Sequence, residues 1–275
     1  ADVNATVTYT KVGSLVPSAS DVNFPGAPTV GYPNDPSDAT KVTPAGVPTV
    51  PGYTAHDPEG HVLTPGSSYQ PSDPTKDTTI TYTADQQEGS VSYVDDTTGK
   101  TLKTDSISGT TGSKSSYSTS GSIADYKKQG YELVTDGYPA DLTFDNDDRT
   151  DQNYTVHLKH QLTPVNPTDP QTPGAPINPD EPNGPKWPIS TNYDKTVNET
   201  VSYVDQNGHV VAKQHTDSVN FTRTVVVDNV TGEVITSGAG TTAWTATNGD
   251  TTFDAVVSPV VSGSVANKAQ TVVVT

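Results

Sequence analysis

An internal repeat of a strand-like pattern constrains the fold more than any other feature of this sequence. The segment VSYVDDTTG occupies residues 91–99, and VSYVDQNG occupies residues 201–208. Alternate side chains of a β-strand point to opposite faces, so Val91 and Tyr93 are predicted to line one buried face. Each segment then runs through polar residues to a glycine, which is typical of a hairpin turn. A shorter match, VTY at residues 7–9, is predicted to be a core strand of another unit.

Polar boundaries rich in proline divide the 275 residues into four ranges. Residues 1–87 are predicted to form a proline-rich, loop-rich β module. Residues 88–162 carry strand patterns around one short helix, which Gly130 is expected to end, and this favours a β-grasp arrangement. Residues 163–195 are predicted to be a linker. Residues 196–275 repeat the opening strand and its hairpin turn, and they are predicted to form a second β-grasp-like domain.

The predicted linker has a proline at every third position from Pro164 to Pro188. A polyproline II helix has three residues per turn, so this spacing predicts an extended tract with its prolines on one edge. The simplest role for such a tract is a semi-rigid spacer. The alternative is a stripe that docks on an aromatic groove of a neighbouring domain or serves as a PxxP ligand.

Composition favours strands and small cores. Hydrophobic residues make up 31% of the chain, and the 23 prolines favour turns and strands over long helices. The predicted fold class is therefore β-dominated α+β, with tandem β-grasp domains joined end to end in an elongated multi-domain rod.

Charge and motif content exclude several functional classes. The formal net charge is −17 and no basic stripe occurs, so nucleic acid is not an expected partner. The absence of cysteine rules out disulfides and thiol nucleophiles. No stretch approaches about 18 consecutive apolar residues, so membrane insertion is not expected. No common catalytic or nucleotide-binding motif occurs, and the chain is predicted not to be an enzyme.

Several longer strings resemble the mucus-binding adhesins of lactobacilli. Residues 1–87 are similar to the proline-rich mucin-binding module through VTYTKVGSLVP and YPNDPSDATKV. Residues 88–162 resemble a MucBP domain through VSYVDDTTGKTL and GYELV, and residues 196–275 resemble a B2-type domain through FTRTVVVDNVTGEV and AWTA. One departure is visible near the end of the chain, where Gly263 is followed by Ser264 instead of the usual tyrosine.

This resemblance implies a function and a location. It implies a non-catalytic repeat of an extracellular, cell-wall-anchored surface protein of a Gram-positive bacterium, with ubiquitin-like β-grasp domains that bind mucin glycoproteins. It also implies an immunoglobulin-binding side activity like that of protein L. A passive spacer of a surface stalk is a further alternative. Because mucin displays sialic acid and sulfate, an acidic chain is predicted to bind it by stacking and hydrogen bonds against electrostatic repulsion.

Tyrosines in loops are the predicted ligand-binding residues. A flat aromatic ring can stack on a sugar face while its hydroxyl group makes hydrogen bonds. Four tyrosines lie beside proline or glycine, or in turn-rich segments, and are expected to be exposed. They are Tyr32, Tyr53, Tyr69 and Tyr138.

An acidic segment is the predicted cation site. Asp145, Asp147 and Asp151 are interleaved with polar residues ahead of a strand, as oxygen ligands are in calcium loops, although the glycine of an EF-hand is missing. The alternative is a solvated acidic turn, and no cofactor other than Ca²⁺ is predicted. Metal binding by His157 and His160 is not expected, because a spacing of three places them on opposite strand faces as solvated residues.

Overall fold

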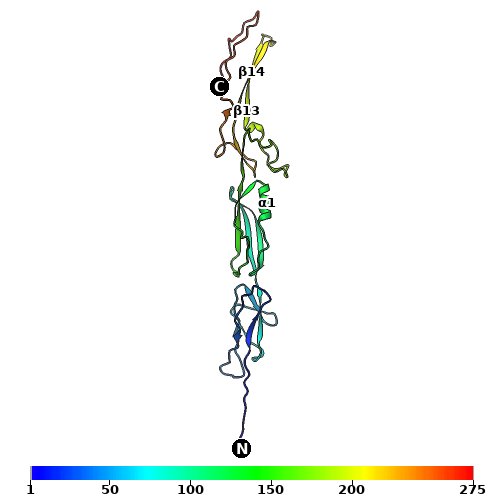
Figure 1. Cartoon of the computed structure of the whole chain (residues 1–275), viewed down its shortest axis with the longest axis vertical. Coiled ribbons are helices and arrows are strands. Elements are labelled where there is room, and N and C mark those ends of the chain that lie inside the picture. Colours follow the sequence, from blue (N-terminus) through cyan, green and yellow to red (C-terminus); the bar gives the residue numbers. More distant parts are fainter. Residues whose placement is uncertain (1, 275) are drawn as a thin grey trace. The chain divides into compact units, whose positions relative to one another are not determined.

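The computed structural model describes residues 2–274, which are dominated by strands. Within that range the helical elements are α1 (Ser120–Lys128) and the short 3-10 helix η1 (Ser190–Asn192). The strands (Figure 1) are β1 (Ser14–Ser18), β2 (Val30–Gly31), β3 (Ala45–Gly46), β4 (Tyr53–His56), β5 (Val62–Leu63), β6 (Ser68–Tyr69), β7 (Thr78–Ala84), β8 (Gln86–Asp95), β9 (Lys100–Thr110), β10 (Tyr131–Asp136), β11 (Gln152–His160), β12 (Leu162–Val165), β13 (Asp194–Val204), β14 (Val210–Thr222), β15 (Val225–Asp228), β16 (Val234–Ile235) and β17 (Thr245–Ala246). The β-dominated α+β class is confirmed. Across residues 2–274, no helix is both long and apolar enough to cross a membrane.

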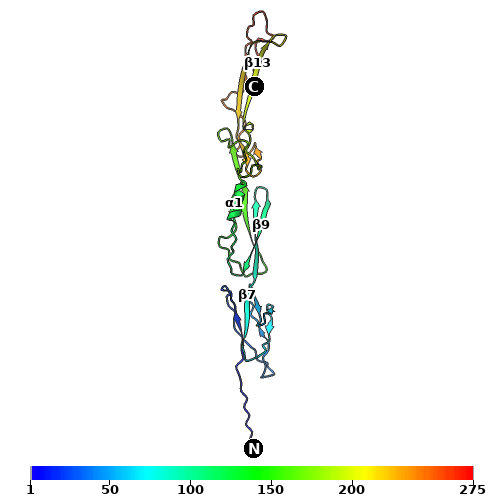
Figure 2. The ribbon, with the colours of Figure 1, turned by 90° about the vertical axis from the view of Figure 1, so that its right-hand side faces the viewer.

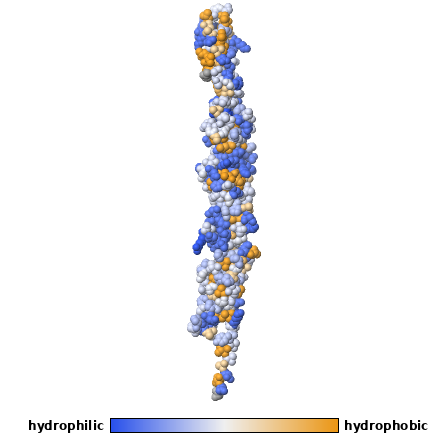
Figure 3. Space-filling model, turned by 60° about the vertical axis from the view of Figure 1, so that its left-hand side comes forward, coloured by the Kyte–Doolittle hydropathy of each residue, from blue (hydrophilic) through white to orange (hydrophobic). Residues whose placement is uncertain are grey.

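The chain divides into two compact units that share strands β10 and β11. One unit comprises Ala1–Thr119 with Val134–His157, and the other comprises Ser120–Leu133 with Leu158–Thr275. Figure 2 shows α1, β7, β9 and β13 in a second view. On the face drawn in Figure 3, hydrophobic residues form small patches among hydrophilic ones, as expected for a chain with few apolar residues.

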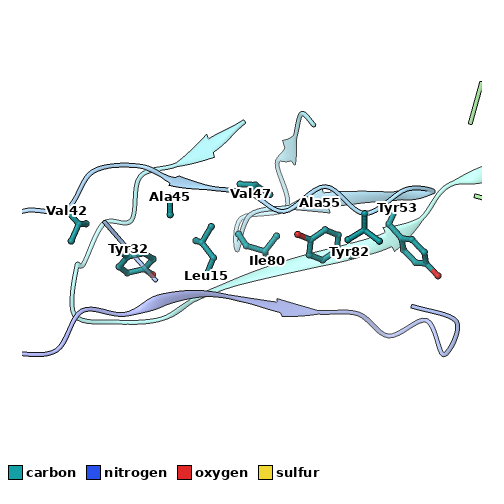
Figure 4. Close-up of a cluster of buried hydrophobic side chains, with 10 residues drawn as sticks. Leu15, Tyr32, Val42, Ala45, Val47, Tyr53, Ala55, Ile80 and Tyr82 are labelled. Carbon is teal, nitrogen blue, oxygen red and sulfur yellow. The ribbon is translucent and has the colours of Figure 1, made fainter. Parts of the chain in front are cut away.

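The first unit begins with a five-stranded sheet in the order β2-β1-β7-β4-β5. Strand β7 lies at its centre, parallel to β1 and antiparallel to β4. Alternate residues of β7 are buried, and Ile80 and Tyr82 pack with Leu15 in one apolar cluster (Figure 4). By contrast, Val7 and Tyr9 are 76% and 81% exposed and lie outside any strand, so the predicted core strand at residues 7–9 is wrong.

Strand β7 continues into β8 with a single intervening residue, Asp85. The Asp85 N–H donates to the Gly52 carbonyl at 2.8 Å, and the Asp85 carbonyl accepts from the Thr111 N–H at 3.0 Å. Burial raises the pKa of the Asp85 carboxyl group, and the nearby Asp148 carboxylate adds to the rise. Both backbone groups of this half-buried joining residue are therefore hydrogen-bonded.

Gly52 is required at this joint for two reasons. It follows Pro51 in a turn closed by the Tyr53 N–H and the Val50 carbonyl at 3.1 Å, and its φ is +79°. Proline followed by a residue of positive φ is the signature of a type II turn. A Cβ at this position would also lie 2.7 Å from the Thr111 side chain, so only glycine fits.

The next sheet has the order β10-β11-β8-β9. Strands β8 and β9 pair over their whole length, with a register shift between Tyr93 and Val94. Val91 and Tyr93 are fully buried, which confirms the predicted inward face. The hairpin turns at Gly99, whose φ is +76° and whose N–H donates to the Asp95 carbonyl at 2.7 Å.

In the second unit, α1 ends where the sequence predicts. Gly130 has a φ of +97°, and a Cβ there would lie 2.5 Å from the Asn229 carbonyl group. The Gly130 carbonyl accepts from the Gln161 N–H at 2.9 Å, and the Gln161 carbonyl accepts from the Asn229 N–H at 2.9 Å. The end of the helix is thereby hydrogen-bonded to the segment that joins β11 to β12.

The proline-rich range 163–195 folds back on itself, so the predicted extended polyproline II tract is wrong. Pro164 lies in β12 and is the register partner of Val226 in β15. A bridge pairs Pro176 with Lys186, and Trp187 packs against a core of Val165, Tyr193, Val225 and Val227. Side chains such as Asn166, whose Oδ1 accepts from the Thr168 N–H at 3.0 Å, place the prolines in consecutive turns.

Beyond this core, β13 and β14 form a long antiparallel hairpin that is labelled in Figure 1. Val201 and Tyr203, from the second copy of the repeat, are only half-buried in β13. The turn is closed by Asp205, whose Oδ1 accepts from the N–H groups of Asn207 at 2.8 Å and His209 at 3.0 Å. The repeat therefore keeps its strand and turn, although the second copy lacks the burial of the first.

His160 is buried, which contradicts the prediction of a solvated side chain. Its Nδ1 lies 2.7 Å from Oδ2 of Asp228 in β15, and the two side chains are 4% and 9% exposed. The other oxygen of Asp228 accepts from the Val230 N–H at 2.8 Å. His157 lies 2.8 Å from the Asp96 carboxylate and is also paired. The prediction treated both residues as strand ends and lacked the partners that other segments supply.

We expect Gly52→Ala to be more destabilising than Gly60→Ala. Both glycines have a positive φ, but a Cβ at Gly60 meets no atom within 4 Å. Gly60→Ala should cost about 1 kcal/mol of unfolding free energy from backbone strain alone. Gly52→Ala should cost about 1–3 kcal/mol more, because Thr111 and Asn146 must move. Urea denaturation followed by circular dichroism measures both, and equal losses would contradict the close packing at this joint.

We expect Asp228→Asn to destabilise the second unit, because it leaves the buried His160 without its anionic partner. The expected loss of unfolding free energy is about 3 kcal/mol. Asp205→Asn is the matched control, since Asp205 also closes a hairpin turn but its pairing with His209, at 3.6 Å, is exposed. Exposed pairs contribute less than about 1 kcal/mol. Similar urea midpoints for the two variants would argue against a buried pair.

Candidate binding site

Two of the four predicted ligand-binding tyrosines belong to the core of the first unit. Tyr32 and Tyr53 are 3% and 8% exposed (Figure 4). The Tyr32 hydroxyl donates to the Lys76 carbonyl at 2.7 Å, and the Tyr53 ring lies edge-on to Phe24 at a centroid distance of 5.1 Å. The prediction that these rings are exposed is wrong, because the proline-rich turns around them close over the core.

Tyr69 is half-buried and packs at the margin of the same core. It lies in the short strand β6, where it is the register partner of Ala45 in β3. Burial raises the pKa of the Tyr69 hydroxyl, and the Asp57 carboxylate adds to the rise. One side of the Tyr69 ring therefore packs against the core. Among the described residues, no other half-exposed aromatic ring contacts it.

Tyr138 lies in a cluster of half-exposed rings, which we call the tyrosine cluster: Tyr117, Tyr138 and Tyr154. The Tyr117 and Tyr138 rings meet edge to face at 5.3 Å, and the Tyr138 and Tyr154 rings meet at 5.7 Å. The Tyr138 hydroxyl lies 2.7 Å from the Ser115 Oγ, to which it donates, and its backbone N–H donates to Asp136 at 3.0 Å. Its ring is thus held by contacts at both ends.

Hydrogen bonds to Asp105 and to the buried Tyr93 hold the Tyr117 ring of the tyrosine cluster in place. The Tyr117 hydroxyl donates to Oδ2 of Asp105 at 2.7 Å and lies 2.5 Å from the hydroxyl of the buried Tyr93. Lys103 lies 3.1 Å from the same Asp105 oxygen. Burial and the hydrogen bonds with Tyr93 and Asp105 raise the pKa of Tyr117. The hydrogen bond from Tyr117, followed by Lys103, lowers the pKa of Asp105.

The tyrosine cluster is suited to binding by contact. Edge-to-face rings present apolar surface that can stack on a sugar face, and nearby hydroxyl groups can make hydrogen bonds. Lys114, which precedes Ser115 in the sequence, forms an exposed ion pair with Asp141 at 2.8 Å. The arrangement provides rigid side chains for recognition.

The sequence analysis predicted one of these three residues, Tyr138, as a ligand-binding residue. Strand alternation could also have indicated Tyr154, because it lies on the same face of β11 as the buried Val156 and Leu158 but near the start of the strand. Tyr117 is the single aromatic residue in a serine-rich segment, KSSYSTS. Its position beside Tyr138 depends on how residues 111–119 fold, which strand periodicity does not reveal.

The three predicted calcium ligands are exposed and are not gathered into one site. Oδ1 of Asp145 accepts from the Asp147 N–H at 3.1 Å, and Oδ1 of Asp147 accepts from the Arg149 N–H at 3.0 Å. From Asp2 to Val274, no group of three His, Cys, Asp or Glu side chains is arranged to hold a metal ion. At least two of these carboxylates instead cap consecutive turns, and no contact joins either of them to Asp151.

We expect Tyr117→Phe to raise the pKa of Asp105 towards its ordinary value of 3.8, because the variant lacks the donated hydrogen bond. A lowered pKa in the folded state stabilises the protein above the ordinary pKa, and this stabilisation is lost as pH falls through the lowered value. Wild type should therefore exceed Tyr117→Phe in stability at pH 7, with a smaller difference near pH 3.

Carboxyl NMR titration and urea denaturation at both pH values measure these effects. Tyr154→Phe is the control, since the Tyr154 hydroxyl accepts from Gln152 at 3.2 Å and bonds to no carboxylate. An unchanged Asp105 pKa in Tyr117→Phe would contradict the proposed support of the tyrosine cluster.

The comparisons with known proteins agree on one family. A family model described as a mucin binding domain matches residues 87–160, which include the tyrosine cluster, and a Muc B2-like domain model matches residues 189–275. The crystal structure of Mub-RV is 34% identical at a TM-score of 0.50, and the match covers 68% of this chain and 89% of that one. The type 2 repeat of the mucus binding protein MUB from Lactobacillus reuteri is also 34% identical at a TM-score of 0.46, with coverages of 67% and 88%. A comparison with curated proteins found no match. Because Mub-RV is 34% identical over 89% of its length, and because both family models match, the chain belongs to the family of mucus-binding repeats.

Proposed function

We propose that this chain is a non-catalytic adhesion repeat that binds mucin glycoproteins. The observation that carries the proposal is the position of the tyrosine cluster inside residues 87–160, the segment that matches the mucin binding domain model. Family membership supports mucus as the target. The tyrosine cluster supplies the chemistry, because it is the one place among the described residues where three half-exposed rings meet.

Binding would proceed by stacking and hydrogen bonding. Each ring contributes a small favourable free energy when it covers a sugar face, about 0.5–1.5 kcal/mol beyond area burial. Such a site is weak alone. Repeated copies along one surface protein would raise the apparent affinity, because the first contact increases the effective concentration of the next.

The finer architecture and the location belong to the same proposal. We infer that residues 86–160 form a β-grasp domain, because the sheet order places the first strand β8 beside the last strand β11 and α1 lies between the two strand pairs in sequence. Tandem domains in an elongated rod, on the wall-anchored surface of a Gram-positive cell, would display the repeat towards mucus. Small-angle scattering tests the rod, since a single compact domain of this size has a radius of gyration of about 19 Å.

Immunoglobulin binding and a passive spacer role are the two alternatives to mucin binding, and a binding experiment can distinguish them. Immunoglobulin capture by strand addition would use backbone groups on a sheet edge such as β13, which pairs along one side with β14. Neither family model nor either solved repeat names an immunoglobulin. A passive spacer would bind neither mucin nor immunoglobulin.

We expect Tyr138→Ala to weaken binding to immobilised gastric mucin about tenfold, as loss of the central ring removes both edge-to-face contacts. Tyr138→Phe should bind nearly as well as wild type if ring stacking dominates. Tyr9→Ala is the control, because Tyr9 is 81% exposed but lies outside the tyrosine cluster.

Surface plasmon resonance on mucin and on immobilised immunoglobulin compares the proposed functions, with melting temperatures as a check of folding. Wild-type binding to immunoglobulin without binding to mucin would favour the alternative. Equal losses for Tyr138→Ala and Tyr9→Ala would remove the tyrosine cluster from the account.

A further inference from the structure

Two cationic side chains converge on one tryptophan in the second unit. The Arg223 guanidinium carbon lies 4.4 Å from the Trp244 ring centroid, and the Lys195 ammonium nitrogen lies 5.0 Å from it. Both distances are within the usual range for cation–π contacts. Trp244 is half-buried, so part of its ring surface is open to solvent.

The sheet β13-β14-β17 brings these residues together from three segments. Lys195 in β13 is the register partner of Phe221 in β14, and Phe221 is the register partner of Ala246 in β17. Arg223 follows β14 directly, and Trp244 precedes β17 directly. Strand pairing therefore fixes the spacing of the two cations and the ring.

These cations lack carboxylate partners. Lys41, Lys103, Lys114 and Lys159 each lie within 4.0 Å of an Asp or Glu oxygen, whereas other cations, such as Lys213, form no such pair within residues 2–274. No such pair forms at Lys195 or Arg223 in the described residues. The neighbouring Asp194 carboxylate accepts from the Asn220 side chain at 2.7 Å instead.

Most of the hydrogen-bond donors on the two cations remain unused. The Arg223 Nε donates to the Asn192 carbonyl at 2.8 Å, which fixes the guanidinium group on the sheet. Its terminal nitrogens and the Lys195 ammonium group donate to no acceptor among residues 2–274. A guanidinium group has five N–H donors in a planar fork that matches carboxylate and sulfate oxygens.

A purely structural role leaves part of this arrangement unexplained. One cation over the ring is enough for a cation–π contact, and a second like charge nearby adds repulsion. The two cations place positive charge beside a half-buried aromatic ring, where an anion would be attracted.

We propose that Lys195, Arg223 and Trp244 form a binding site for the anionic group of an acidic sugar, a carboxylate or a sulfate ester. The cations hold the anionic oxygens through charge-assisted hydrogen bonds, and the open part of the Trp244 ring packs on the sugar. The site rests on the proposed mucin-binding function and adds a second contact to the tyrosine cluster. It replaces the expectation that an acidic chain meets anionic mucin through neutral contacts alone.

Three polymer-carried sugars serve as probes: N-acetyllactosamine, its 6-sulfated form and its sialylated form. Wild type should bind at least one anionic probe about tenfold more tightly than the neutral one. Lys195→Gln combined with Arg223→Gln should abolish that preference, so that the variant binds the anionic and neutral probes with similar affinity. Lys213→Gln is the matched control for Lys195→Gln, because Lys213 is exposed on the same hairpin and has no ring or carboxylate partner. The sulfated and sialylated arms distinguish the two sources of the anion.

Two further measurements keep the test independent of folding and of the mucin assay. The anionic probe should change the tryptophan fluorescence of wild type but not of Trp244→Phe, which retains Trp187. Raising NaCl from 50 to 300 mM should weaken binding of the anionic probe more than binding of the neutral probe, owing to screening.

No preference of wild type for an anionic probe, or its retention in the double variant, would overturn the site. If the double variant keeps its mucin binding while Tyr138→Ala loses it, the anionic-sugar site fails and the proposed function stands. If wild type itself does not bind mucin, the proposed function is rejected.

Discussion

Backbone hydrogen bonding between long strands is the interaction on which this fold depends, because the chain has few apolar side chains to bury. The chain is 31% hydrophobic and contains no cysteine, so neither a large core nor a disulfide supports the sheets. Strands β8 and β9 pair along about ten residues, and β13 pairs with β14 from Asp194 to Val204. Single residues, Asp85 and Gln161, separate consecutive strands of neighbouring sheets. Each apolar cluster can stay small because the strands continue from sheet to sheet.

The acidity of the chain has a structural role within this scheme. Hydrogen bonds from Ser37, Thr40 and Thr75 lower the pKa values of Asp35, Asp38 and Asp73, respectively. In each case the donors lie two residues after the aspartate, as in an Asx turn. These carboxylates stabilise the folded state above their ordinary pKa, and the contribution disappears as pH falls through the lowered value. Part of the negative charge is thus a consequence of building many turns without large side chains.

Sequence reasoning predicted local features well and long-range partners poorly. The buried face at Val91 and Tyr93 and the helix end at Gly130 follow from alternation and from glycine's backbone freedom, both of which are local. The folded proline-rich range, the burial of Tyr32 and the pairing of His160 with Asp228 depend on residues that are distant in sequence. For the candidate sites, Tyr138 was predicted, but Tyr117 and Trp244 gain their partners through loop conformation and strand register, which composition does not encode.

The parallel pairing of β1 with β7 has a mechanical consequence. β1 is the first strand of this sheet in the sequence, and β7 is the strand through which the chain leaves the sheet for β8. A pull towards the two ends of the chain therefore acts on opposite ends of two parallel neighbours and slides them past each other. In that geometry the rungs from Leu15 and Thr78 to Ser18 and Thr81 share the load together, whereas an antiparallel hairpin pulled at its open end separates one rung at a time. The sheet is therefore arranged to resist tension that is applied along its strands.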